Sequence, residues 1–204
     1  MTAYSLMVEN NSSNRVDFCM FQTPPDLGRV DVNTLAWFVE PAYPTTTVNF
    51  QWDTSYSFVW SDAGPLSPGV RFTASQVWDA DPMDSQLQAV RLFYGDGAYT
   101  FGRLAPSAAR YAGSLYVEQG DDVPLRGGSV GIGMSGSGTF AVDSQPNQHL
   151  VFEPHPEYWL VAGSFERGQV LDVAQMSTAL KIEYFGARTS MTVSLGMDNT
   201  LAIV

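Results

Sequence analysis

A chain of 204 residues with 21 acidic and 10 basic side chains carries a formal net charge of −11, which opposes binding to nucleic acid and to anionic lipid surfaces. Its single cysteine, Cys19, excludes an internal disulfide, and no apolar run approaches the roughly 18 residues that a membrane-spanning helix needs. We therefore expect one domain over residues 1–204, with no membrane span and no nucleic-acid partner.

At the beginning of the chain, residues 1–9 contain neither a basic stretch nor a long apolar core. A secretory signal needs both, so the sequence predicts a cytoplasmic protein. Export without a leader remains an open alternative.

Alternation of apolar and polar residues with a period of two recurs wherever the chain is not a turn, and it predicts β-strands. Only residues 171–180 have apolar residues at helical spacing, enough for a short helix or a connecting turn. Loops rich in proline, glycine or small polar residues are expected at 22–28, 63–69, 102–113 and 186–189. The expected strands cover residues 4–8, 16–20, 47–52, 55–60, 89–94, 98–101, 139–142, 149–152, 190–195 and 200–204.

Short turns between consecutive strands predict hairpins. We expect such turns at 53–55, at Gly95-Asp96-Gly97, at 145–148 and at 196–199. Many short strands and almost no helix together predict an all-β fold. Its expected form is a single-domain antiparallel β-sandwich with at most one or two short helices.

The segment Val130–Gly138 contains G-x-G-x-x-G in Gly131, Gly133 and Gly136. This pattern binds a dinucleotide only between a strand and a helix whose N-terminal amides face the pyrophosphate. Here the following residues predict another strand. We therefore interpret the glycines as points of close backbone approach or as bulges in a sheet, and expect no cofactor.

The two histidines of the chain lie close together, in the stretch from His149 to Glu157. On an extended strand His149 and Glu153 share one face, so they and His155 are candidate metal ligands. The alternative interpretation is a strand that ends in a proline-flanked loop, where the same residues only satisfy hydrogen bonds. No nucleophile is marked near them, and we assign no catalytic residue.

Aromatic residues suggest a different kind of site. Trp159 and Tyr158 follow His155 and Glu157, and these four residues are the candidate ligand-binding group, because ring faces beside polar side chains suit carbohydrates. The competing interpretation places most tryptophans in the core, with Trp159 as the exposed one.

Three other features have plainer explanations. The acidic group of Asp79, Asp81 and Asp84 lacks the turn glycine and closing glutamate of a calcium-binding EF-hand, which favours a solvated loop. Ser135 lacks the glycine and the helix that a hydrolase nucleophile requires. Cys19 has no basic neighbour in sequence, which is typical of a small core residue.

Several segments resemble the RhiA family of rhizosphere-expressed bacterial proteins. The similar segments are 35–38, 44–48, 56–60, 97–101, 130–136, 145–148 and 154–159, so the resemblance covers nearly the whole chain. It implies a bacterial protein of plant- or soil-associated life under quorum-sensing regulation. It supplies no catalytic residues.

Three hypotheses of function follow. The first is a non-enzymatic protein that binds a glycan or a protein partner. The second is a metal- or carboxylate-dependent enzyme that uses His149, Glu153, His155 and Glu157. The third is a protein that associates with copies of itself through strand edges.

Overall fold

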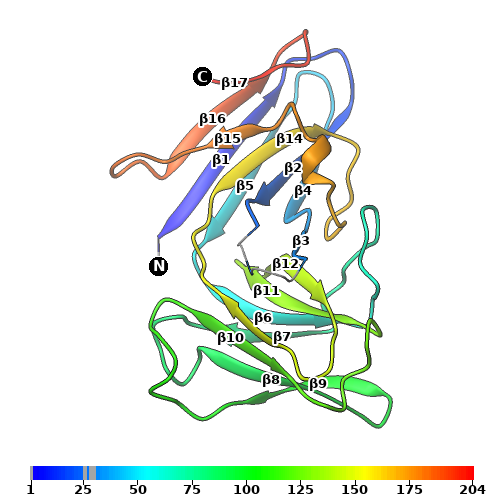
Figure 1. The fold of residues 1–204 in the computed structure, drawn as a ribbon. Helices are drawn as coiled ribbons and strands as arrows, with labels where there is room; N and C mark the ends of the chain where they lie inside the picture. The colour runs from blue at the N-terminus through cyan, green and yellow to red at the C-terminus, as the bar shows by residue number, and fades with distance from the viewer. Residues whose placement is uncertain (1, 25–26, 28–30) are drawn as a thin grey trace.

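The computed structural model describes residues 2–24, 27 and 31–204 (Figure 1). In these ranges the chain is nearly all β, with one short 3-10 helix, η1 (Val173–Gln175), inside the segment where a short helix was expected. The all-β prediction is thus confirmed. Across the same ranges, no helix has the length and apolarity to cross a membrane. Residues 25, 26 and 28 of the loop predicted at 22–28 lie outside the described residues.

Two four-stranded sheets pack face to face at the end of the molecule that contains the first and last strands (upper half of Figure 1). We call this pair the terminal sandwich. Its sheet orders are β17-β16-β1-β5 and β15-β14-β2-β4. The strands are β1 (Ala3–Asn10), β2 (Val16–Gln22), β4 (Phe38–Ala42), β5 (Thr47–Asp53), β14 (Tyr158–Gly163), β15 (Leu180–Ile182), β16 (Ser190–Leu195) and β17 (Leu201–Ile203).

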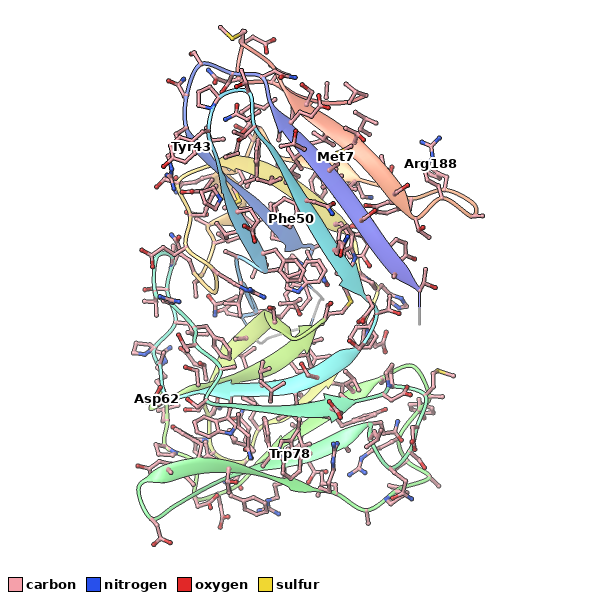
Figure 2. The ribbon with its side chains drawn as sticks, turned by 180° about the vertical axis from the view of Figure 1, so that it is seen from behind. Met7, Tyr43, Phe50, Asp62, Trp78 and Arg188 are labelled. Carbon is pink, nitrogen blue, oxygen red and sulfur yellow. The ribbon has the colours of Figure 1, made fainter. Side chains whose placement is uncertain are left out.

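The other two sheets form a second pair, which we call the central sandwich (lower half of Figure 1). Its sheet orders are β13-β10-β8-β9 and β3-β12-β11-β6-β7. Figure 2 shows Trp78 in this half, where it packs against the core at 5.9 Å from the Phe101 ring. The strands are β3 (Asn33–Thr34), β6 (Tyr56–Ser61), β7 (Gln76–Ala80), β8 (Ala89–Gly95), β9 (Ala98–Arg103), β10 (Leu115–Gln119), β11 (Ser129–Met134), β12 (Ser137–Asp143) and β13 (His149–Phe152).

Most strand pairs are antiparallel, as predicted, and two of the described pairs, β1 with β16 and β8 with β10, are parallel. The predicted hairpins of β8 with β9 and of β16 with β17 are confirmed. Asp96 (φ 51°) and Gly97 (φ 81°) form the two-residue turn of the first of these.

The other two predicted hairpins are wrong, although their strands are present. β5 pairs with β1, whereas β6 pairs with β11 and β7, because Trp52 is buried in the terminal core and Phe58 in the central core. Likewise β12 and β13 belong to different sheets of the central sandwich. Phe140 and Phe152 belong to the same core but come from different sheets, so the two strands lie in opposite layers instead of edge to edge.

The glycine-rich segment forms the hairpin of β11 and β12, which confirms its interpretation as a site of close backbone approach. A Cβ on Gly131 would overlap the backbone oxygen of Phe140, and the register shifts between Ile132 and Gly133, as at a β-bulge. Ser135 (φ 49°) and Gly136 (φ 76°) make the turn. In the described chain a strand follows these glycines directly, so no helix faces them.

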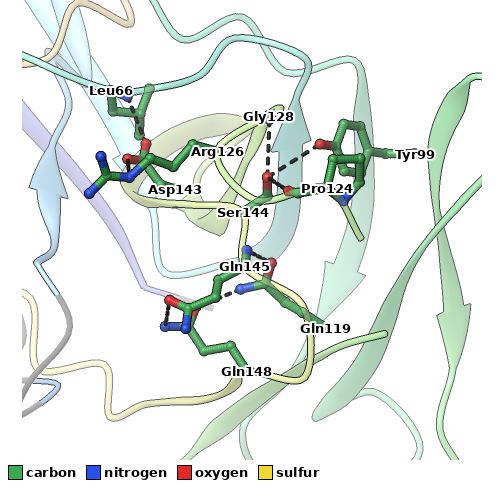
Figure 3. Close-up of polar contacts among 10 residues, drawn as sticks. All are labelled: Leu66, Tyr99, Gln119, Pro124, Arg126, Gly128, Asp143, Ser144, Gln145 and Gln148. Atoms are coloured by element: carbon green, nitrogen blue, oxygen red, sulfur yellow. Dashed lines mark hydrogen bonds and ion pairs between the residues drawn. The ribbon is translucent and has the colours of Figure 1, made fainter. Parts of the chain in front are cut away.

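The connection between β12 and β13 is held by a buried serine (Figure 3). The Ser144 hydroxyl donates to the carbonyl of Pro124 at 2.7 Å and accepts from the amide of Gly128 at 3.1 Å. It also lies 3.2 Å from the Tyr99 hydroxyl. This serine therefore ties the crossover between the two layers to the loop that precedes β11.

The two sandwiches meet at a seam that includes Trp37, which is fully buried in the segment between β3 and β4. Its indole N–H donates to the Met134 carbonyl at the end of β11. A smaller apolar cluster that contains Leu35, Val59 and Phe72 lies beside it. These shared contacts support the prediction of one domain, which stays a prediction.

Candidate functional site

A cavity of about 680 Å³ lies at the seam, where the 153–157 segment passes from β13 to β14. Gln22, Thr23 and Pro24, at the end of β2, line it as well. Ile132, Thr139 and Phe140 contribute from the β11–β12 hairpin, and Tyr56 from the start of β6. We call this hollow the seam cavity.

The seam cavity brings together four residues that the sequence marks as candidates. His149, Glu153, His155 and Glu157 all line it, and all four are exposed. Within residues 2–24, 27 and 31–204, however, no three His, Cys, Asp or Glu side chains gather in a way that could hold a metal ion. The prediction of a metal site at His149, Glu153 and His155 therefore gains no support here and stays a prediction.

The floor of the seam cavity is apolar, and the sequence did not point to it. Ile132, Phe140 and Leu150 are each at most 5% exposed and belong to the central core. They come from three separate strands, and their alternating pattern is that of any core residue. Only the fold shows that they also form the base of a cavity with a polar rim.

Glu157 is fixed at the rim by two neighbours from distant parts of the chain. Its Oε1 atom accepts from the Lys181 ammonium at 2.8 Å, and its Oε2 atom accepts from the Thr23 hydroxyl at 3.0 Å. The hydrogen bond from Lys181, followed by that from Thr23, lowers the pKa of Glu157. Glu157 is therefore a carboxylate at neutral pH, able to accept hydrogen bonds but poorly suited to donate a proton.

Tyr158 lies outside the seam cavity. It is 7% exposed and packs in the terminal core, with its ring 6.0 Å from Trp37 and 5.1 Å from Trp52. Since successive side chains of a strand point to opposite faces, Tyr158 turns inward where Glu157 turns to the rim.

Trp159, expected to be exposed, is half-buried and is also absent from the residues described as lining the cavity. Its ring stacks on Phe21 at 6.4 Å, and its indole N–H donates to the Thr23 hydroxyl at 2.8 Å. Of the four predicted ligand-binding residues, the seam cavity thus includes His155 and Glu157. Ligand binding by the group stays a prediction.

The other marked residues have structural contacts. Cys19 is fully buried, and burial raises the pKa of its thiol, as expected of a core residue. The hydroxyl of Ser135 accepts from the Asp53 amide at 3.2 Å. Asp81 and Asp84 each accept from a backbone amide two residues further on, which is a local turn contact.

The fold and the site define an all-β protein of two stacked sandwiches with a polar-rimmed cavity between them. The chain belongs to the RhiA family, whose sequence model matches residues 1–204. It is 35% identical over 202 residues to Protein RhiA of Rhizobium leguminosarum bv. viciae, an alignment that covers 98% of this chain and 85% of that protein. No solved structure matches the chain.

Proposed function

We propose that this protein is a non-enzymatic binding protein that recognises a glycan in the seam cavity. The observation that carries the proposal is the apolar floor of Ile132 and Phe140 beneath a rim that includes His155 and Glu157. A sugar presents both an apolar ring face and hydroxyl groups, which such a floor and rim complement. The volume of about 680 Å³ also falls within the usual range of ligand pockets.

A glycan array followed by calorimetry on the best sugar tests this proposal. Glu153→Gln and His155→Ala remove rim groups and should weaken binding, whereas Glu40→Gln, an exposed carboxylate on β4, should leave it unchanged. Val151→Trp fills the cavity from a position that is 42% exposed and should abolish binding. If no sugar binds but a protein partner does, and Val151→Trp abolishes that binding, the cavity takes a peptide instead.

The biological setting is proposed from the family. We infer a protein of a soil- or plant-associated bacterium, cytoplasmic and under quorum-sensing control. Cell fractionation and comparison of transcript levels with and without the signal molecule check these points. A product found only outside the cells would overturn the cytoplasmic assignment.

Self-association is a second candidate function, favoured by the outer face of the β17-β16-β1-β5 sheet. Among the outward side chains of β1, β5 and β16 that the structure describes, the charged ones are Glu9 and Asp53, which lie toward opposite ends of the face. Met7, 42% exposed, lies at the centre of this face, opposite Asn49 and Thr192 (Figure 2). In a chain of charge −11, two copies approach with least repulsion here. Light scattering against concentration should show a dimer that Met7→Glu dissociates.

An enzyme remains the alternative, since two histidines and two carboxylates line one cavity. Such an enzyme would use Glu153 with His149 or His155 for proton transfer. Substrate turnover that is lost in a folded His155→Ala variant would favour it over simple binding. Elemental analysis of the purified protein tests its metal-dependent form.

A further inference from the structure

A second pocket, of about 330 Å³, opens at another part of the seam and shares no described lining residue with the seam cavity. Arg71 and Arg167 line it, together with the turn of the β11–β12 hairpin. We call it the arginine pocket. The loop after β6, which carries Arg71, rises from the central sandwich toward the terminal one (right side of Figure 1).

Backbone hydrogen bonds fix the two segments that carry these arginines. Arg71 forms an isolated β-bridge with Gln169, and the amide of Phe72 donates to the carbonyl of Gly168 at 2.9 Å. Gly168 in turn donates to the carbonyl of Ala36 at 2.8 Å. Three distant parts of the chain are thus joined around the pocket, so the backbone under both arginines is held in place.

Arg167 is also oriented by its own side-chain contacts. Its Nη2 atom donates to the hydroxyl of Ser137, and its guanidinium lies over the Phe38 ring, 5.1 Å from the centroid. Both contacts leave further donors of the planar guanidinium available. The hydroxyl and the aromatic ring therefore present the group toward the pocket without neutralising it.

The charge of the pocket runs against that of the whole protein. Among the described residues that line it, none is Asp or Glu, although the chain carries 21 acidic side chains. Arg71 forms an ion pair with Glu166 at 4.0 Å, and both side chains are more than half exposed, so that ion pair is weak. At physiological salt, charges more than about 8 Å away are largely screened, which leaves the local arginines to determine binding.

One wall of the pocket is apolar, while Thr73 and Ser137 add polar groups to its lining. Leu35, Val59 and Phe72 are each at most 4% exposed and form one wall. Gly136, in the hairpin turn, has no side chain to narrow the pocket, and the space around its Cα is open, since a Cβ built there meets nothing within 4 Å. The pocket thus combines two cationic groups with an apolar wall and a clear entrance.

We propose that the arginine pocket binds a small organic carboxylate with an apolar body. The planar guanidinium pairs with a carboxylate through two parallel hydrogen bonds, and the Phe72 wall receives the apolar part. The arginine pocket shares no described lining residue with the seam cavity, so either binding proposal can be disproved without affecting the other. It also gives a role to the glycine-rich segment, whose hairpin turn lines the pocket.

Titration with benzoate, followed by amide NMR shifts, tests the proposal. Benzoate should shift the amide signals of Gly136, Gly138 and Gly168, and it should bind more tightly than acetate or benzyl alcohol, each of which lacks one half of the ligand. Arg71→Gln and Arg167→Gln should each weaken benzoate binding roughly tenfold or more, because each removes a charged hydrogen-bond donor. Raising the salt concentration should weaken it further.

Arg188→Gln is the matched control, because Arg188 lies at an exposed turn before β16 (Figure 2) and is not among the described residues that line the pocket. It should bind benzoate as the unaltered protein does. Arg167→Lys keeps the charge but not the planar group. Its affinity for benzoate should fall between those of the unaltered protein and the Arg167→Gln variant. Benzoate binding that survives both glutamine variants, that weakens equally in Arg188→Gln, or that is replaced by binding of phenyl phosphate alone overturns the proposal.

Discussion

Trp37 donates its indole N–H to the carbonyl oxygen of Met134 at 2.8 Å, across the seam between the two sandwiches. Trp37 is fully buried and Met134 is 1% exposed, so water does not compete for this bond. Trp37 also packs against Tyr158 and Trp52 in the terminal core. One side chain therefore connects the terminal core to the end of a central strand.

Trp37→Phe should destabilise the protein by about 2–4 kcal/mol, because it leaves a buried carbonyl without a donor and opens a small void. Urea unfolding measures the change. Trp159→Phe is the control, since its indole N–H bonds to the exposed Thr23 hydroxyl, and it should cost less than about 1 kcal/mol. Equal losses in the two variants would show that the seam bond is unimportant.

Ser144→Ala should cost about 2–3 kcal/mol, because it removes the acceptor of the buried Gly128 amide and the donor to Pro124. Thermal and urea unfolding both report this loss. Ser107→Ala, in an exposed loop, removes one local contact to the Ala109 amide and should change stability by no more than about 0.5 kcal/mol. A Ser144 variant as stable as this control contradicts the role shown in Figure 3.

Gly131→Ala should cost about 3 kcal/mol or prevent folding, because the new methyl group overlaps the Phe140 backbone oxygen and backbone cannot move aside cheaply. Gly95→Ala is the matched change, since a Cβ there meets nothing within 4 Å. It should leave the unfolding midpoint within a few degrees of the original, about 0.5 kcal/mol or less. Expression level and circular dichroism of both variants give a first measurement.

The protein should lose stability at alkaline pH. Burial raises the pKa of Tyr158 to about 12, and burial likewise raises the pKa of Tyr56 and Tyr184. Because these phenols hold their protons more tightly in the folded state, their contribution is complete below pH 10 and declines as the pH rises toward about 12. Urea midpoints measured across this range should fall.

Tyr158→Phe should make the fall of stability with pH shallower, because it removes a phenol whose pKa differs between the folded and unfolded states. Tyr111→Phe, at a position 76% exposed, should leave the slope unchanged. If the Tyr158 variant declines as steeply as the unaltered chain, the alkaline loss has another origin.

The strands could be predicted from the sequence, but not all of their partners. Alternation at Trp52 and at Phe58 is a local signal that survives in the structure. Which core each residue enters depends on the whole chain. The local pattern therefore predicts one hairpin for two strands that are only two residues apart but belong to different sheets.

The sequence could predict only those residues of the candidate site that lie close together along the chain. His149, Glu153, His155 and Glu157 lie within one short stretch, and the structure places them around one cavity. Tyr56 and Phe140 reach the same cavity from other strands, and no local pattern distinguishes them from core residues. Tyr158 is contiguous with these residues but does not line the cavity. Side chains one residue apart on a strand point to opposite faces, so Tyr158 points into the core.

The parallel pairing of β1 with β16 has a consequence for the newborn chain. The ribosome releases β1 well before β16, so β1 keeps one open edge while the intervening strands are synthesised. Open edges recruit other chains. We expect truncation before Ser190 to leave this edge permanently exposed and to yield aggregates, because β16 is the strand that covers it.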